Sequence, residues 1–194
     1  MIGSRHPLAI HRIFHPTDFS PDSQVAFAHA LKLALVFRAE LTIMHVDPDV
    51  SPEGFEDFPR IRPTLAQWGL LPESSSKSDV TTLGIRIRKV RALAADAKQA
   101  IIHHLTAAPT DLMVLATHKH EGFAGWVHHA VAEPVSREMH VTTLFVPSNV
   151  AGFVARTTGE TSLHRVLLPI SSQPPSQQAI IHRAVTRGLD PNVR

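Results

Sequence analysis

Short apolar segments alternate along this chain with segments whose apolar residues recur at helical spacing, and this alternation limits the possible folds most strongly. Segments of strand character cover residues 12–15, 41–46, 84–90, 111–116 and 142–146, and helical spacing covers residues 25–37, 94–106 and 130–139. Neighbouring parallel strands need crossover connections, which helices usually supply. The pattern therefore predicts an α/β domain with a parallel sheet and helices on both faces.

The boundaries of these segments carry local signals. Pro16 ends the first strand, and residues 17–21 (TDFSP) offer a hydroxyl cap followed by a proline in the first turn of a helix. Asp96 lies near the positive end of a later helix, where its charge is favourable. The nearly continuous apolar run over residues 111–116 is typical of a strand that is covered on both faces.

Three stretches are less regular. Residues 47–82 contain five prolines and a polar run, so we expect a loop with one short helix around Leu65 to Trp68. In residues 84–90, isoleucines alternate with arginines, as in a half-exposed strand whose basic side faces water or a partner. Proline is tolerated in the first turn of a helix, so Pro134 predicts that the last helix begins close to Val131.

Length and composition narrow the class of protein. The 194 residues suffice for one domain and a fragment, since a domain of about 150 residues can bury its own core. Apolar residues make up 43% and charged residues 19%, as in an ordinary soluble globular protein. The chain contains no cysteine, which excludes thiolate chemistry and indicates a reducing compartment. No segment approaches the roughly 20 apolar residues of a membrane span, so we expect a cytoplasmic protein without membrane contact.

Charge gives little support for nucleic-acid binding. The net charge is only +2, although the sequence pI is about 9.4. A basic strand carrying Arg86, Arg88, Lys89 and Arg91 is the single candidate surface, and an ordinary solvated face explains it better. The fourteen histidines would make the surface more positive at mildly acid pH, but this composition is not by itself a sensor.

Three stretches together resemble the universal stress protein family over roughly residues 10–147. They are IFHPTDFSPDSQVAFAHALKLA, ELTIMHV and DLMVLATHKHEGFAGWVHHAVAEPVSREMHVTTLFVP, which match the family's first, second, fourth and fifth strand regions. The resemblance implies a flavodoxin-like domain, of the adenine nucleotide alpha hydrolase-like type, with a five-stranded parallel sheet. It also implies a homodimer formed through the last strand, at Thr142, Thr143, Leu144, Phe145 and Val146.

ATP-binding members of that family carry Gly, two residues, Gly, nine residues, then Gly followed by Ser or Thr. In this chain the four positions fall at Ala116, Lys119, His129 and Ala130, and all four depart from the pattern. Glycine lets the backbone approach a phosphate and the hydroxyl donates to it, so the losses at His129 and Ala130 argue against tight ATP binding. Positive charge at residues 118–120 and the amides at the start of the next helix leave weak anion binding open.

Other candidate residues lie at the strand ends. Asp18 matches an aspartate beside adenine and ribose in ATP-binding relatives, although a helix cap or a turn explains it equally well. Val46 matches a position whose backbone faces adenine, and flexibility explains Gly122 and Gly125 better than ligand contact does. The candidate nucleotide site is Pro16, Thr17, Asp18, Val46, Ala116, Thr117, His118, Lys119, Gly122, His129, Ala130 and Val131.

A metal site and a nucleophile are two further possibilities. Imidazole and carboxylate groups that could converge at the strand ends are those of His15, Asp18, His118, His120, His128 and His129. No compact ligand motif is present, because adjacent histidines on a helix point in different directions. We therefore expect no native metal, and no nucleophilic catalysis in a chain without cysteine or an elbow-type serine.

The C-terminal part repeats the beginning of the chain. HRVLLPISSQPPSQQAIIHRAV follows the plan of HRIFHPTDFSPDSQVAFAHALKLA, which indicates the first strand and helix of a second module, as in tandem family members. We expect a universal stress protein domain over residues 1–148, a linker with a possible hairpin over 149–164, and an incomplete second module over 165–194. One strand and one helix are not stable alone, so we expect an intermolecular role for residues 165–194.

Two functional classes follow. The first is a non-enzymatic, dimeric stress-response protein whose nucleotide cleft is degraded. The second is a nucleotide-binding module or slow ATPase, with ATP as the ligand.

Overall fold

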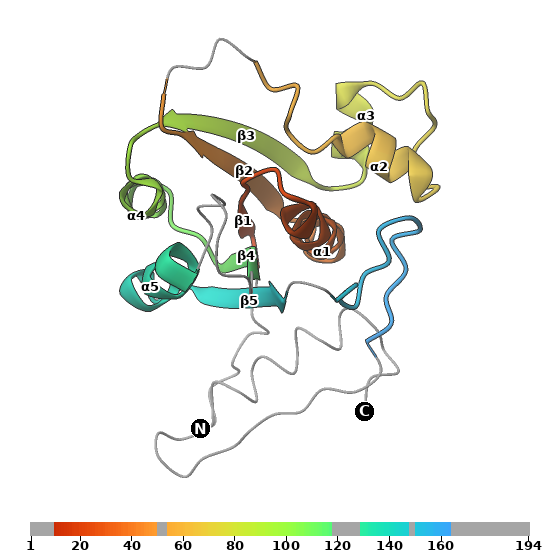
Figure 1. Ribbon diagram of the computed structural model, residues 1–194. Helices are drawn as coiled ribbons and strands as arrows, with labels where there is room; N and C mark the ends of the chain where they lie inside the picture. The colour runs from red at the N-terminus through yellow and green to blue at the C-terminus, as the bar shows by residue number, and fades with distance from the viewer. Residues whose placement is uncertain (1–9, 50–53, 118–128, 148–149, 164–194) are drawn as a thin grey trace, which may run out of the picture.

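The computed structural model describes residues 10–49, 54–117, 129–147 and 150–163. Its centre is an all-parallel sheet of five strands in the order β3-β2-β1-β4-β5 (Figure 1). The strands are β1 Arg12–Pro16, β2 Glu40–Asp47, β3 Arg86–Leu93, β4 Leu112–Thr117 and β5 Thr142–Pro147. The helices are α1 Pro21–Phe37, α2 Ile61–Gln67, α3 Lys77–Thr82, α4 Ala97–Ala107 and α5 His129–Met139. The predicted α/β fold with a five-stranded parallel sheet is confirmed.

Helices cover both faces of the sheet. On one face, α1 packs over β1, β4 and their neighbours, and its residues Leu31 and Ala34 are fully buried. On the other face, α4 and α5 pack against each other and against the sheet, with Ile101 and Val135 buried there (Figure 1). The continuous apolar run predicted a strand covered on both sides, and β4 is buried over residues 112–116.

Local capping fixes the starts of α1 and α4. The hydroxyl of Ser20 accepts from the backbone N–H of Ser23, and Pro21 is the first residue of α1. Asp96 caps α4 by accepting from the N–H of Gln99. Both signals were readable in the sequence, because Ser and Asp caps satisfy amides that have no partner inside the helix.

The segment between β2 and β3 is more regular than the sequence indicates. It contains α2 and also α3, which begins with a reciprocal capping box between Ser76 and Asp79. Our expectation of a single short helix was wrong, because the buried side chains of Leu65 and Val80 anchor both helices to the core. The strand β3 starts two residues later than expected, since Gly84 has a φ of 79° and closes the turn after α3.

The expected start of α5 was also wrong. This helix begins at His129, so Pro134 lies inside the helix and not in its first turn. The φ of proline fits a helix, but the ring removes one intrahelical hydrogen bond and crowds the carbonyl four residues earlier. A short helix that packs on α4 tolerates this loss.

Residues 150–163 form an arm that returns to the domain. An antiparallel bridge joins Val154 to Thr161, and the N–H of Ser162 donates to the carbonyl of Phe153 at 2.8 Å. The arm lies beside α1 and α2 (Figure 1), where Val154 is only 1% exposed. We refer to residues 150–163 as the hairpin arm.

Candidate functional site

The strand order reverses between β1 and β4, because β2 and β3 extend the sheet on one side and β5 extends it on the other. In such sheets, ligands bind beyond the carboxyl ends of the strands at this reversal point. The carboxyl ends of β1 and β4 are Pro16 and Thr117, so the predicted residues Thr17, Asp18 and Ala116 do lie at this edge.

Every polar atom of Thr17 is already bonded within the chain. Its N–H donates to the carbonyl of Met44 at 2.8 Å, and its carbonyl lies 2.7 Å from Nδ1 of His45. Its hydroxyl oxygen accepts from the hydroxyl of Ser23 at 2.8 Å and from the N–H of Phe19 at 3.1 Å. Thr17 is therefore a structural residue of the β1–α1 turn, and it is 1% exposed.

Asp18 forms the turn before α1. Its Oδ1 accepts from the N–H of Ser20 at 3.0 Å, while Ser20 itself caps the helix. The sequence left ligand contact and local structure open for Asp18, and this bond shows a local structural role for Oδ1. Its negative charge also lies close enough to His15 to influence that imidazole.

Val46 and Ala116 point into the core. Val46 is 2% exposed and packs on the α4–α5 side of the sheet, and Ala116 is 2% exposed on the α1 side. Neither side chain is directed toward solvent at the strand ends. Thr117 is half-buried.

Three aromatic rings cover the carboxyl ends of β1 and β2, and we call Phe19, His45 and Phe58 the aromatic cap. Phe19 has a left-handed φ of 63°, and its ring stacks on the imidazole of His45 at 4.0 Å with an interplanar angle of 26°. Phe58 meets Phe19 edge-on at 5.3 Å and is 1% exposed. The positive groups of Lys89 and Arg91 each lie 5.6 Å from the centre of the Phe58 ring. Motif reasoning missed this cluster.

Charged groups fix the position of the cap. Both ring nitrogens of His45 face oxygen atoms, since Nδ1 faces the carbonyl of Thr17 and Nε2 lies 3.1 Å from Oδ1 of Asp47. Asp47 also accepts from Arg91 at 2.7 Å, and a second nitrogen of Arg91 lies 4.0 Å from Asp57. Because these groups hold one another, the His45 ring cannot rotate away from Phe19 without breaking hydrogen bonds.

His15 lies beneath this edge, fully buried. Its Nδ1 donates to the carbonyl of Val114 at 2.9 Å, and its Nε2 has no hydrogen-bond partner among the described residues. Burial lowers the pKa of His15 from 6.5 to about 4, against the smaller opposing effects of the Val114 bond and of Asp18. His15 is therefore neutral at physiological pH.

Several predicted site residues fall outside the described part of the chain, namely His118, Lys119, His120, Gly122 and His128. His129, Ala130 and Val131 are the first residues of α5. Within the described residues, no group of three or more His, Cys, Asp or Glu side chains could hold a metal.

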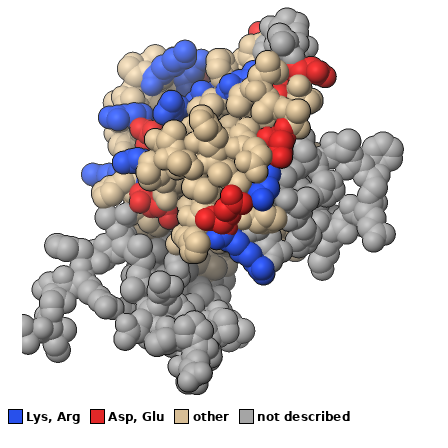
Figure 2. Space-filling view, turned by 90° about the vertical axis from the view of Figure 1, so that its left-hand side faces the viewer, with Lys and Arg blue, Asp and Glu red and all other residues tan. Residues whose placement is uncertain are grey.

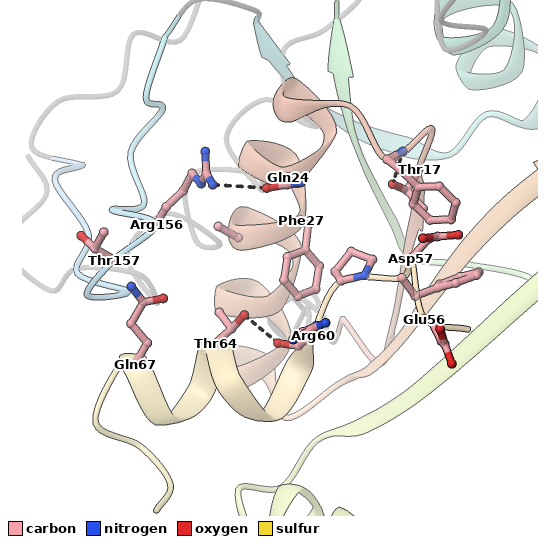
Figure 3. A pocket seen from close by; sticks show the side chains of 14 residues that line it. Thr17, Gln24, Phe27, Glu56, Asp57, Arg60, Thr64, Gln67, Arg156 and Thr157 are labelled. Atoms are coloured by element: carbon pink, nitrogen blue, oxygen red, sulfur yellow. Dashed lines mark hydrogen bonds between the residues drawn. The ribbon is translucent and has the colours of Figure 1, made fainter. Parts of the chain in front are cut away.

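A pocket of about 550 Å³ lies beside the aromatic cap, on the α1 side (Figure 3). Phe19 and Phe58 of the cap line it, together with Phe27 of α1. The hairpin arm supplies a further wall through Arg156 and Thr157, and Arg156 donates to Gln24 of α1 at 3.3 Å. This pocket is built partly from residues that lie outside the predicted nucleotide site.

The basic residues of β3 do not share one surface. Arg86 and Arg88 are exposed, and Arg88 influences the imidazole of His104 on the α4 side. Lys89 and Arg91 lie instead over Phe58. Figure 2 shows Lys and Arg side chains gathered near the top of the view, with Asp and Glu side chains interspersed below them. The structure does not gather these four residues into a nucleic-acid surface.

The fold and the strand-end site define an α/β protein of the flavodoxin-like type. The sequence model of the universal stress protein family matches residues 9–147, and the chain belongs to this family. No curated protein matches the chain. None of the helices in the described ranges combines the length and apolar character that crossing a bilayer requires.

Solved structures that are similar to this chain include three universal stress proteins. UspA from Lactobacillus plantarum is 21% identical, with a TM-score of 0.46, over 71% of this chain and 97% of that one. A universal stress protein in complex with cAMP is 19% identical, with a TM-score of 0.45, over 71% and 97% of the two chains. A universal stress protein from Archaeoglobus fulgidus is 15% identical, with a TM-score of 0.44, over 70% and 92%.

Proposed function

We propose that this protein is a non-enzymatic, dimeric universal stress protein whose nucleotide cleft is closed by its own side chains. The observation that carries this proposal is the aromatic cap at the carboxyl ends of β1 and β2. Phe19 occupies this edge and stacks on His45. The polar atoms of Thr17 are hydrogen-bonded within the protein.

An adenine ring at this edge would have to replace protein contacts. Each aromatic pair of the cap contributes about 0.5–1.5 kcal/mol beyond area burial, and two such pairs involve Phe19. Moving Phe19 would also expose its own ring, which is half-buried, and would disturb the β1–α1 turn in which this residue lies. Stacking of the adenine would replace only part of this energy. The cap therefore lowers the equilibrium affinity for a nucleotide and not only the rate of its binding.

The phosphate side of the family motif supports the same proposal. The four motif positions hold Ala116, Lys119, His129 and Ala130 in place of three glycines and a hydroxyl residue. Ala116 is buried within the sheet. This chain therefore lacks the glycines and the hydroxyl group that bind the triphosphate in ATP-binding relatives.

Weak nucleotide or anion binding is the second candidate, and the position of α5 favours it. In a parallel sheet, the helix that follows a strand begins on the side where that strand ends, so we expect the N-terminal amides of this 11-residue helix near the carboxyl end of β4. His118 and Lys119 precede it in the sequence. This candidate predicts affinity for phosphates without a need for adenine.

The dimer belongs to the proposal as well. β5 is the outer strand of the sheet, and its outer edge has no strand neighbour among the described residues. The proposed interface consists of Thr142, Thr143, Leu144, Phe145 and Val146, of which Phe145 is 40% exposed. The chain contains no cysteine, so the proposed dimer does not depend on disulfides. This is consistent with the reducing cytoplasm that we propose as its location.

Calorimetric titration separates the two candidates. We expect no saturable heat when the full chain is titrated with MgATP or cAMP up to millimolar concentration, because the cap excludes the base. Magnesium tripolyphosphate is the matched control, since it presents the phosphates alone. Binding of tripolyphosphate and ATP with equal weak affinity would favour the anion-binding candidate, and micromolar binding of either nucleotide would refute the closed cleft.

A further inference from the structure

A buried histidine is one of the residues that hold the hairpin arm on the domain. His29 lies on α1 and is fully buried. Its Nδ1 lies 2.8 Å from the carbonyl of Val25, and its Nε2 lies 2.9 Å from the N–H of Phe153 and 3.2 Å from the N–H of Val154. One ring nitrogen thus bonds within the helix, and the other holds two consecutive amides of the arm.

These contacts permit one protonation state. A carbonyl oxygen only accepts, so Nδ1 of His29 must carry the hydrogen that Val25 receives. Backbone amides only donate, so Nε2 must present its lone pair to Phe153 and Val154. In a protonated imidazole, Nε2 would carry a hydrogen directed at two other N–H groups. The docked arm therefore requires neutral His29.

The hairpin arm lies so close to the imidazole of His29 that the ring cannot change its hydrogen bonds while the arm stays docked. A Cβ atom on Gly152 would come within 2.3 Å of Nε2 and Cε1 of His29, so the backbone rests directly on the imidazole. The ring of Phe153 meets the imidazole edge-on at 4.5 Å and 90°. Because no space remains between ring and backbone for water, a proton on Nε2 can be relieved only by movement of the arm.

We propose that the hairpin arm is a detachable element, latched to α1 by neutral His29 and released when this histidine is protonated in mildly acid solution. Release withdraws Arg156 and Thr157 from the pocket beside the aromatic cap, so the latch also controls access to this pocket.

The sign of the pH effect follows from burial. Burial lowers the pKa of His29 below its ordinary value of 6.5, and the Val25 bond opposes this effect only in part. Protons therefore bind the released state better than the docked state. The contribution of neutral His29 to docking is fully present above pH 6.5 and is lost as the pH falls below this value.

Charged groups near the latch do not supply an alternative switch. Lys32 lies three residues along α1, and β4 and β5 contain no charged residue. On the arm, Arg156 is bonded to Gln24 and Glu160 to Thr158. Within the described chain, only burial and the Val25 bond shift the pKa of His29. The other attachment, from Nε1 of Trp68 to the carbonyl of Arg156 at 2.9 Å, does not titrate.

Trp68 provides the readout for a test. In a full-length Trp126→Phe background, Trp68 is the remaining tryptophan, and its emission reports whether the arm is docked. We expect the docked emission to be lost in a one-proton transition with its midpoint below pH 6.5, while the far-ultraviolet circular dichroism of the domain stays constant. The His29→Gln variant is the matched control, because its amide oxygen can accept from the arm without titrating, and its emission should not change over this pH range.

A transition of equal size in the His29→Gln variant would overturn the proposal, since another group would then control the arm. Constant emission of the parent protein down to pH 4.5 would overturn it as well. Release that occurs only together with loss of circular dichroism would also contradict it, because the arm would then follow global unfolding. Backbone amide signals of Phe153 and Val154 give a second measurement, in which selective shifts at these two amides are expected.

Discussion

The Phe58→Ala substitution is expected to lower the free energy of unfolding by about 3–5 kcal/mol. Phe58 is 1% exposed, meets Phe19 edge-on and lies beneath the positive groups of Lys89 and Arg91. Truncation leaves a cavity at the centre of the aromatic cap and removes the ring that these two cations cover. Urea denaturation at neutral pH, followed by circular dichroism, measures the change.

Phe55 supplies the matched control. Its ring lies 5.2 Å from that of Phe58, but its side chain is 51% exposed. The Phe55→Ala variant therefore loses one aromatic contact without creating a buried cavity, and we expect a loss of about 1 kcal/mol or less. Equal effects of the two substitutions would contradict the description of Phe58 as the buried centre of the cap.

In the His15→Asn variant, the free energy of unfolding is expected to fall by about 3 kcal/mol less than in the parent protein when the pH is lowered from 6.5 to about 4. The folded pKa of His15 is lowered from 6.5 to about 4, so the unfolded chain binds the proton better. The stability contributed by neutral His15 is fully present above pH 6.5 and is lost between pH 6.5 and about 4. Asparagine keeps a donor near Nδ1 for the carbonyl of Val114 but does not titrate in this range.

Denaturant unfolding of both proteins at a series of pH values gives this difference directly. Contributions from His29 and His104, whose pKa values are also lowered by burial, occur in both proteins and cancel. The His11→Asn variant, at an exposed histidine, is the control for the substitution itself. If the His15→Asn variant also lost stability in parallel with the parent, His15 could not be a buried neutral histidine.

Local patterns predicted the sheet and the main helices well. The apolar run before Thr117, the hydroxyl cap before Pro21 and the acidic cap at Asp96 each depend on neighbours in sequence, and the structure confirms them. α3 was missed because its serines suggest a loop, although the spacing of Ser76 and Asp79 contains a readable capping box. The position of Pro134 inside α5 was missed because packing against α4 outweighs one lost hydrogen bond.

The site was less predictable, because its contacts join distant parts of the chain. Motif matching predicted that Thr17 and Asp18 lie at the carboxyl end of β1, as they do. Their hydrogen-bond partners Ser23, Met44 and Ser20 were not predicted. Phe19 attains its place through a left-handed backbone and a stack on β2 that no local pattern encodes.

The latch was hidden from sequence reasoning for the same reason. His29 bonds to an amide that lies 124 positions further along the chain. On its own helix it looks like one more histidine in a histidine-rich sequence. Its acceptor role becomes visible only once the hairpin arm is placed on α1.

We propose that the aromatic cap closes the carboxyl ends of β1 and β2 to nucleotides. The most direct test follows the backbone amide signals of Thr17, Asp18 and Phe19 by nuclear magnetic resonance while MgATP is added to millimolar concentration. A closed cleft predicts that these three signals stay unchanged, even if amides near the start of α5 shift. Saturable shifts of all three, with micromolar affinity, would show that adenine enters the edge and would contradict the account.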